Sequence, residues 1–146
     1  MHYTGLAIIH HLLAFGLVIM LAMELAYLRG DTVPVKRLTG LDAGYGVVAV
    51  LVLLVGAARV VWGEKGWEFY QANPFFWAKI ATFSAIGLLS IAPTIAFIRW
   101  GRAAKADPAF QPQAGEVKRL AGLVRIEVLL LLPLAAFAAT MARWAG

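Results

Sequence analysis

The sequence predicts an all-α protein, an up-and-down bundle of four transmembrane helices that forms a single integral membrane domain. Of the 146 residues, 62% are hydrophobic and 14% are charged, which is too apolar for an ordinary soluble domain. Apolar runs long enough to cross about 30 Å of hydrocarbon, which takes about 20 residues of helix, occupy residues 5–28, 41–62, 75–98 and 120–142. Little of the chain remains for a second domain.

Capping and breaking residues mark the ends of the predicted helices. The first run lacks a basic leading segment and a small-residue cleavage site, so we expect a retained helix and not a signal peptide. Asn73-Pro74 is an N-cap followed by a proline at the first helical position, which predicts the start of the third helix. Pro93 and Pro133 fall inside the third and fourth runs, where each is expected to kink its helix. Further ends and turns are expected at Gly30, Gly40 and Gly63.

The basic residues predict the orientation of the chain, because lysine and arginine mark cytoplasmic loops. The first and third connections carry Arg29, Lys36, Arg37, Arg99, Arg102, Lys105, Lys118 and Arg119. The second connection has only Lys65, which Glu64 and Glu68 balance. We therefore expect a multi-pass protein of the bacterial inner membrane with both termini outside, and no nucleic-acid partner despite the net charge of +5. The segment Ala103–Glu116 is predicted to be a flexible cytoplasmic loop.

The second connection is rich in aromatic residues. Trp62, Trp67, Phe69, Tyr70, Phe75, Phe76 and Trp77 surround Gly63-Glu64-Lys65-Gly66. Aromatic rings prefer the headgroup level of a membrane, so an interfacial belt is one interpretation. A lid over an outward-facing pocket is the other.

Polar side chains inside apolar spans are costly and therefore indicate a functional site. At about 1.5 Å per residue, His10, Arg59 and Lys79 each lie roughly 10–12 Å to the outer side of the middle of their span, so they can meet in one outer layer. His11 points about 100° away from His10. Three helical stripes are expected to face the interior: His10, Ala14, Leu17, Leu21 and Glu24; Tyr45, Ala49, Val52, Gly56 and Arg59; and Lys79, Phe83, Ile86, Ser90, Pro93 and Phe97.

A second polar layer, nearer the cytoplasm, consists of Glu24, Asp42, Arg125 and Glu127. Opposite charges at similar depth predict structural ion pairs, with Arg125 pairing Glu24 or Asp42, because neither partner is tolerable alone in hydrocarbon. Arg125 and Glu127 face different directions, so one can serve the bundle and the other a neighbouring subunit of a homo-oligomer or larger membrane complex. A proton or ion path is the functional alternative.

The outer layer is predicted to bind a cofactor. A histidine can bind a metal ion, and two cations beside it can bind an anionic group of the same cofactor, such as a propionate. The chain has no cysteine, and two adjacent histidines are too few for zinc or copper. Haem b needs one axial imidazole and is often housed in four-helix bundles. His10 is therefore the expected axial ligand, with His11, Arg59, Lys79 and Tyr45 as further cofactor-binding candidates.

A set of polar and helix-punctuating residues carries a resemblance to a known family. They are His10-His11, Glu24, Asp42, Tyr45-Gly46, Gly63-Glu64-Lys65-Gly66, Asn73-Pro74, Lys79, Pro93, Arg125 and Glu127. With them, the chain resembles over nearly its whole length a family of small predicted bacterial membrane proteins, classed as a domain of unknown function. This resemblance implies a four-span fold and names no activity.

An early histidine and a lysine that opens the third span carry a more distant resemblance. His10 or His11 and Lys79, in Trp77-Ala78-Lys79, are similar to the functional pair of the J-type membrane protoporphyrinogen oxidase, which binds haem. The resemblance implies a catalytic role for Lys79 and a protoporphyrinogen-oxidase-like oxidoreductase. The tyrosine-leucine-proline-arginine segment that closes the first span in that family is replaced here by Ala26-Tyr27-Leu28-Arg29.

Three functions therefore remain as hypotheses. The leading one is a haem b or porphyrin-binding membrane protein with a redox or porphyrin-related role. The others are a non-catalytic accessory or scaffold subunit, and a small proton or ion conductor that uses Glu24, Asp42 and Glu127.

Overall fold

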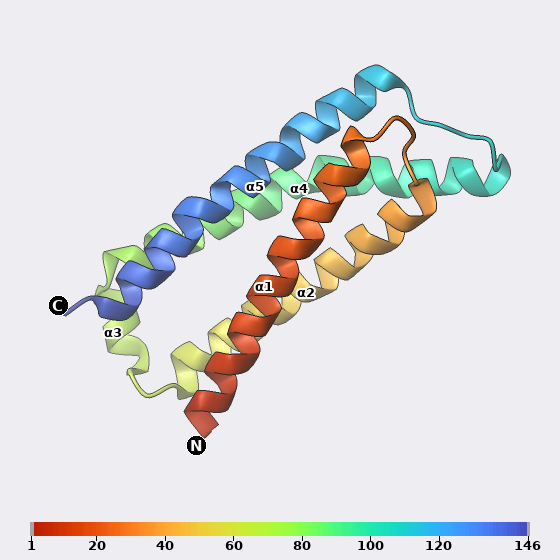
Figure 1. The fold of residues 1–146 in the computed structure, drawn as a ribbon. Coiled ribbons are helices and arrows are strands. Elements are labelled where there is room, and N and C mark those ends of the chain that lie inside the picture. Colours follow the sequence, from red (N-terminus) through yellow and green to blue (C-terminus); the bar gives the residue numbers. More distant parts are fainter. Residues whose placement is uncertain (1, 146) are drawn as a thin grey trace.

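The computed structural model describes residues 2–145 and contains five helices within them. They are α1 (His2–Arg29), α2 (Val35–Trp62), α3 (Gly66–Ala72), α4 (Pro74–Ala106) and α5 (Ala114–Arg143). The four longest are apolar and long enough to cross a membrane. The predicted all-α bundle of four long helices is therefore confirmed (Figure 1).

The four long helices form a ring in the order α1, α2, α4, α5. Helix α1 packs on α2 and α5, and α4 packs on α5 and α2. Among the described residues, no close backbone contact joins the diagonal partners α1 and α4, or α2 and α5. Each long helix therefore has two long neighbours, α3 packs in addition on α2 and α4, and the remaining surface of each helix is left to the surroundings.

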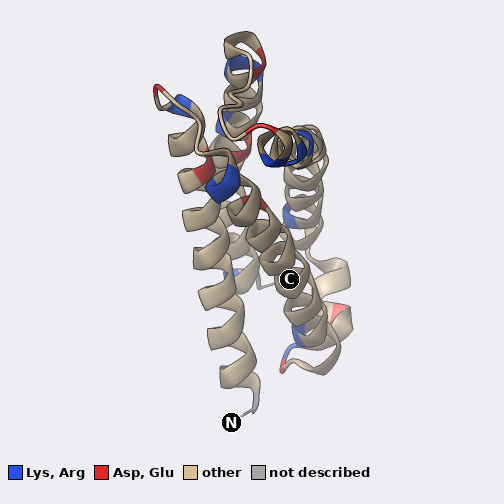
Figure 2. Cartoon of the chain, turned by 90° about the vertical axis from the view of Figure 1, so that its right-hand side faces the viewer, with Lys and Arg blue, Asp and Glu red and all other residues tan. Residues whose placement is uncertain are grey.

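We call the two ends of the bundle the loop end and the terminal end. The loop end carries the connections 30–34 and 107–113, and the terminal end carries α3 and the two chain termini (Figure 1). Nine of the 13 lysines and arginines belong to the loop end, where Figure 2 shows most of the blue segments. These are Arg29, Lys36, Arg37, Arg99, Arg102, Lys105, Lys118, Arg119 and Arg125.

The helix boundaries agree with the sequence at some points and correct it at others. The Asn73 side chain accepts a hydrogen bond from the Phe75 backbone N–H (3.0 Å), and Pro74 is the first residue of α4, as predicted. Helix α2 ends directly before Gly63, where an ideal Cβ would lie 2.0 Å from the carbonyl oxygen of Arg59, so only glycine fits. In contrast, Gly40 lies inside α2, and the expected end there is wrong.

The long third connection is shorter than the sequence predicts. Helix α4 continues to Ala106 and α5 begins at Ala114, so the segment outside both helices is 107–113 and not 103–116. The polar turns that extend these helices contribute nothing to an apolar run, which is why hydropathy alone missed them. Both interior prolines, Pro93 and Pro133, lie within uninterrupted helices.

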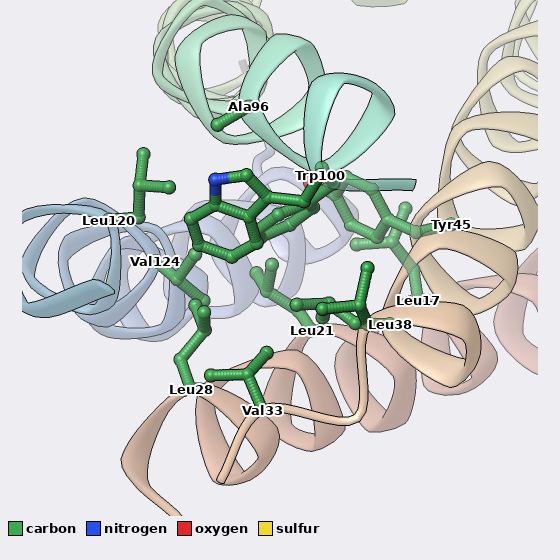
Figure 3. Close-up of a cluster of buried hydrophobic side chains, with 12 residues drawn as sticks. Leu17, Leu21, Leu28, Val33, Leu38, Tyr45, Ala96, Trp100, Leu120 and Val124 are labelled. Carbon is green, nitrogen blue, oxygen red and sulfur yellow. The ribbon is translucent and has the colours of Figure 1, made fainter. Parts of the chain in front are cut away.

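The main hydrophobic core lies toward the loop end (Figure 3). Leu21, Leu38, Leu120 and Val124 are completely buried there, and all four long helices contribute to the cluster. A smaller cluster beneath α3 at the terminal end consists of Tyr70, Phe76 and Met141. Many large apolar side chains on the outer faces are exposed, as expected for helices surrounded by lipid. The two clusters leave a hollow between them.

Candidate functional site

The hollow at the terminal end is a cavity of about 670 Å³. Its walls come from all four long helices and from α3, and they are mostly aliphatic and aromatic. His10, His11, Arg59 and Lys79 supply the imidazole and charged groups of the lining. The structure thus brings together the three residues that the sequence placed in one outer layer, with His11 beside them.

The helical stripes explain how these side chains reach the cavity. On α1, Leu17, Leu21 and Glu24 are buried, and His10 continues the same stripe into the cavity. On α4, Ile86 and Phe97 are buried, and Lys79 continues that stripe in the same way. On α2, Tyr45 is buried, and Arg59 at the end of the same stripe lines the cavity. Because each stripe runs from the core into the cavity, side-chain facing was predictable from helical periodicity.

His10 is half-buried and lies against a glycine. An ideal Cβ on Gly56 would lie 3.5 Å from Cε1 of His10, an ordinary van der Waals distance, so the imidazole lies close to the backbone of α2 at this glycine. The Nδ1 atom of His10 is buried without a hydrogen-bond partner among residues 2–145. Such a buried polar atom costs free energy and often marks a place where a further group binds.

His11 behaves differently from its neighbour. It is exposed, and its Nδ1 atom lies 2.6 Å from the carbonyl oxygen of Ala7, within its own helix. The two imidazole rings are 6.2 Å apart and nearly perpendicular. The divergence predicted for adjacent helical residues is therefore observed, and His11 is already engaged with its own backbone.

Arg59 and Lys79 make the cavity electropositive. Both are half-buried, and they come from α2 and α4, which lie side by side. No acidic residue lines the cavity, and neither cation forms a salt bridge within the described part of the chain. An anionic group on an otherwise apolar ligand would find two partners here.

The aromatic connection folds into α3, a short helix that the sequence did not predict. Trp67 and Tyr70 of α3 line the cavity. The segment is fastened to the end of α5 by two bonds: Lys65 Nζ donates to the carbonyl oxygen of Ala142 (2.8 Å), and Asn73 Nδ2 donates to that of Met141 (3.0 Å). The lid interpretation therefore has the pocket that it requires. Glycines at 63 and 66 and the pair Asn73-Pro74 bracket α3 and were its only sequence signal.

Helix α5 also contributes residues that the sequence analysis missed. It lines the cavity with Leu131, Leu134, Ala135, Ala138 and Met141. These positions recur at helical spacing, and the two alanines leave room on their face. None of them has chemistry of its own, so periodicity was the only available signal.

Tyr45 lies outside the cavity, contrary to its predicted cofactor-binding role. It shares the inward stripe of Arg59 but lies 14 residues before it, which is about 21 Å along a helix. Its side chain is buried in the core near the loop end, close to the carboxyl groups of Glu24, Asp42 and Glu127. Depth, not facing, excludes it from the site.

The inner polar layer is assembled from three helices, without the predicted arginine. Glu24 on α1, Asp42 on α2 and Glu127 on α5 are buried and lie near one another. One oxygen of Glu24 and both oxygens of Glu127 have no hydrogen-bond partner among the described residues. Across residues 2–145, no group of three or more histidine, cysteine, aspartate or glutamate side chains is arranged to hold a metal ion.

The ion pair predicted for Arg125 is absent from the described structure. Arg125 is exposed, and the one salt bridge found between described residues joins Arg99 to Glu116. Glu127 faces inward on the same side of α5 as the buried residues Leu120 and Val124. Arg125, two residues earlier on the helix, points to a different side. A similar depth in the bundle was therefore not enough to predict an ion pair.

We expect Arg125→Gln to change the free energy of unfolding by no more than about 0.5 kcal/mol, as for an ordinary surface substitution. Breaking a buried ion pair would instead cost about 3–5 kcal/mol. Thermal unfolding in a neutral detergent measures the difference. A loss of several kcal/mol would mean that Arg125 is paired in the membrane.

The comparisons with known proteins place the chain in a family without identifying a close relative. Residues 3–146 match a family model described as "Predicted membrane protein (DUF2214)". No curated protein and no solved structure matches the chain. The match covers all five helices except the first residue of α1.

Proposed function

Because the chain belongs to the family of predicted membrane proteins DUF2214, we propose a function that is carried out within the bilayer. The protein binds haem b or a related porphyrin in the cavity at the terminal end, and its role is redox or porphyrin chemistry. The observation that carries the proposal is the joint placement of His10, Arg59 and Lys79 in one apolar cavity.

The residues of the cavity fit such a group in four respects. A volume of about 670 Å³ is within the usual range of small-molecule sites, which are mostly apolar with a few placed polar groups. The aliphatic and aromatic walls suit the faces of a porphyrin ring. The two cations suit its propionate groups, and the imidazole suits its iron.

Each polar residue then has a defined task. His10 would hold the iron through its imidazole, which lies beside the backbone of α2 at Gly56. Lys79 and Arg59 would bind and orient the propionates. Trp67 and Tyr70 of α3 would exclude water from the outer side. When bound, haem would supply one-electron chemistry, with a potential set by its axial ligand and surroundings.

An absorption spectrum tests this proposal. The protein, purified in mild detergent and titrated with haemin, is expected to develop a Soret band that shifts on reduction with dithionite. A preparation that stays spectroscopically identical to free haemin would contradict the proposal. The hypothesis of a non-catalytic accessory or scaffold subunit would then be favoured over that of a haem-binding protein.

A proton conductor is a second candidate, and the buried carboxyl groups favour it. Glu24, Asp42 and Glu127 lie within the bundle without a cation partner among residues 2–145, and intramembrane carboxyls often belong to proton relays. In liposomes that contain a pH-sensitive dye, this candidate requires proton uptake that Glu24→Gln abolishes. Uptake no faster than in empty liposomes would exclude it.

We further propose that the loop end is cytoplasmic in a bacterial inner membrane, so that the cavity faces outward. The charge imbalance between the two ends supports this orientation. The chain has no cysteine, so Ala109→Cys and Ala72→Cys each introduce a single reporter at an exposed position. An impermeant thiol reagent is expected to label position 72 and not 109 in intact cells. The reverse pattern would mean that the cavity faces the cytoplasm.

A further inference from the structure

A second hollow lies at the loop end, between the last turn of α1 and the first half of α5. This groove has a volume of about 670 Å³ and is also lined by residues 30–33, 111 and 112. Its charged lining consists of the cations Arg29, Lys118 and Arg125 and the acid Asp31. Its lining is more polar than that of the cavity at the terminal end, and it adjoins the basic connections.

Helix α5 shapes one wall of the groove. Lys118, Gly122 and Arg125 are spaced four and three residues apart, so they share one face of the helix. Apart from the adjoining residues and backbone of α5 itself, no atom of the described residues lies within 4 Å of the place that a Cβ on Gly122 would occupy. The two cations therefore border an open gap. Across the groove, the Gln111 side chain accepts a hydrogen bond from the Val33 N–H (3.0 Å) and donates one to the Val33 carbonyl (3.2 Å).

The positive charge of the groove is not neutralised by ion pairs in the described residues. Arg29, Lys118 and Arg125 form no salt bridge there. Glu116, which precedes Lys118 and Arg125 on α5, is already bound by Arg99 and by the indole N–H of Trp100 (2.6 Å). Glu127 is buried on another face. Three cations that have no salt bridge among residues 2–145 and that surround a gap fit an anion with several oxygen acceptors.

The position of the groove selects the kind of anion. Arg125 lies 11 residues from the start of α5, about 16 Å along the helix, and the adjoining side chains Ile126 and Leu129 are 47% and 53% exposed. The groove thus borders both the basic loops and the apolar surface that faces lipid. We propose that it binds the phosphate headgroup of an anionic phospholipid, whose acyl chains lie along α5. Basic pockets between transmembrane helices on the cytoplasmic side suit such headgroups.

The test compares lipids by native mass spectrometry of the full chain released from mixed micelles. Phosphatidylglycerol is expected to bind at least about tenfold more tightly than phosphatidylcholine. Both lipids carry a phosphate, but the basic side chains of the groove repel the choline cation of phosphatidylcholine, and one such charge contact has an effect of that order. Arg125→Gln is expected to lower the affinity for phosphatidylglycerol about tenfold. Gly122→Leu should do the same without altering any charge, since it fills the gap.

Arg119→Gln is the matched control, because it removes the same charge from the neighbouring turn but does not line the groove. The Arg119→Gln variant is expected to bind phosphatidylglycerol with the same affinity as the unaltered protein. Equal losses for Arg119→Gln and Arg125→Gln would overturn the proposal in favour of a diffuse surface charge. Equal affinity for the two lipids would also overturn it, as would inorganic phosphate that displaces the lipid at low millimolar concentration. Unfolding in neutral detergent verifies that each variant is folded.

Discussion

His10→Ala is expected to lower the affinity of the protein for haem by more than about 100-fold, because loss of the axial ligand exceeds the 10–100-fold effect of losing a partner of such a ligand. His10 is the imidazole that lies on the inward stripe of α1 and packs on Gly56. Its replacement enlarges the cavity and removes no packing of the main core. The Soret band in a haemin titration measures the loss.

His11→Ala is the matched control, since the two histidines are adjacent in sequence and both line the cavity. The imidazole of His11 is exposed and bonded to the carbonyl of Ala7, so its removal is expected to change haem affinity by less than about tenfold. Equal losses from the two variants would reject His10 as the axial ligand. Haem binding that is retained in both variants would mean that another residue binds the iron.

Lys79→Ala tests whether Lys79 binds a propionate group and not the iron. It is expected to weaken haem binding about tenfold, the order of one charge-assisted hydrogen bond, and to leave the position of the Soret band unchanged. A shifted band would mean that Lys79 contacts the iron.

Asn73→Ala is expected to lower the free energy of unfolding by about 2 kcal/mol, the sum of a lost N-cap and a lost interhelical hydrogen bond of about 1 kcal/mol each. The Asn73 side chain is completely buried. It caps α4 through the Phe75 N–H and ties α3 to α5 through the carbonyl of Met141. Thermal unfolding in detergent, followed by tryptophan fluorescence, measures the change.

Asn73→Ser divides the two effects, because serine caps a helix well but lacks the amide group that donates to Met141. About half of the loss should be recovered. Full recovery would mean that the bond to Met141 adds no stability, and no recovery would mean that the cap adds none.

The sequence was sufficient for the fold class and for the facing of most candidate site residues. Apolar length identified the four long helices, and helical periodicity directed His10, Arg59 and Lys79 toward one interior. Asn73-Pro74 located the start of α4 because capping chemistry is local. These features depend on residues close together in the chain.

The remaining errors concern features that depend on the packing of several helices. Tyr45 shared a stripe with Arg59, but the cavity ends before it reaches that depth. Arg125 shared a depth with Glu24 and Asp42, but it points away from them. The α5 wall consists of ordinary aliphatic residues, whose role appears only when three other helices surround them. Depth and facing must both be known to place a polar side chain.

The uneven packing of the bundle has a consequence for how it moves. The main core joins the helices toward the loop end, whereas at the terminal end a cavity separates them and the smaller cluster consists of two aromatic side chains and one methionine. Local opening costs least where few apolar contacts must be broken. The helix pairs α1–α2 and α4–α5 should therefore act as the arms of a hinge whose pivot is the core. Amide exchange is expected to be fastest in the first turns of α1, because hydrogen bonds from Lys65 and Asn73 hold the end of α5. An opening beside these turns of α1 would give a hydrophobic ligand a sideways route from the bilayer.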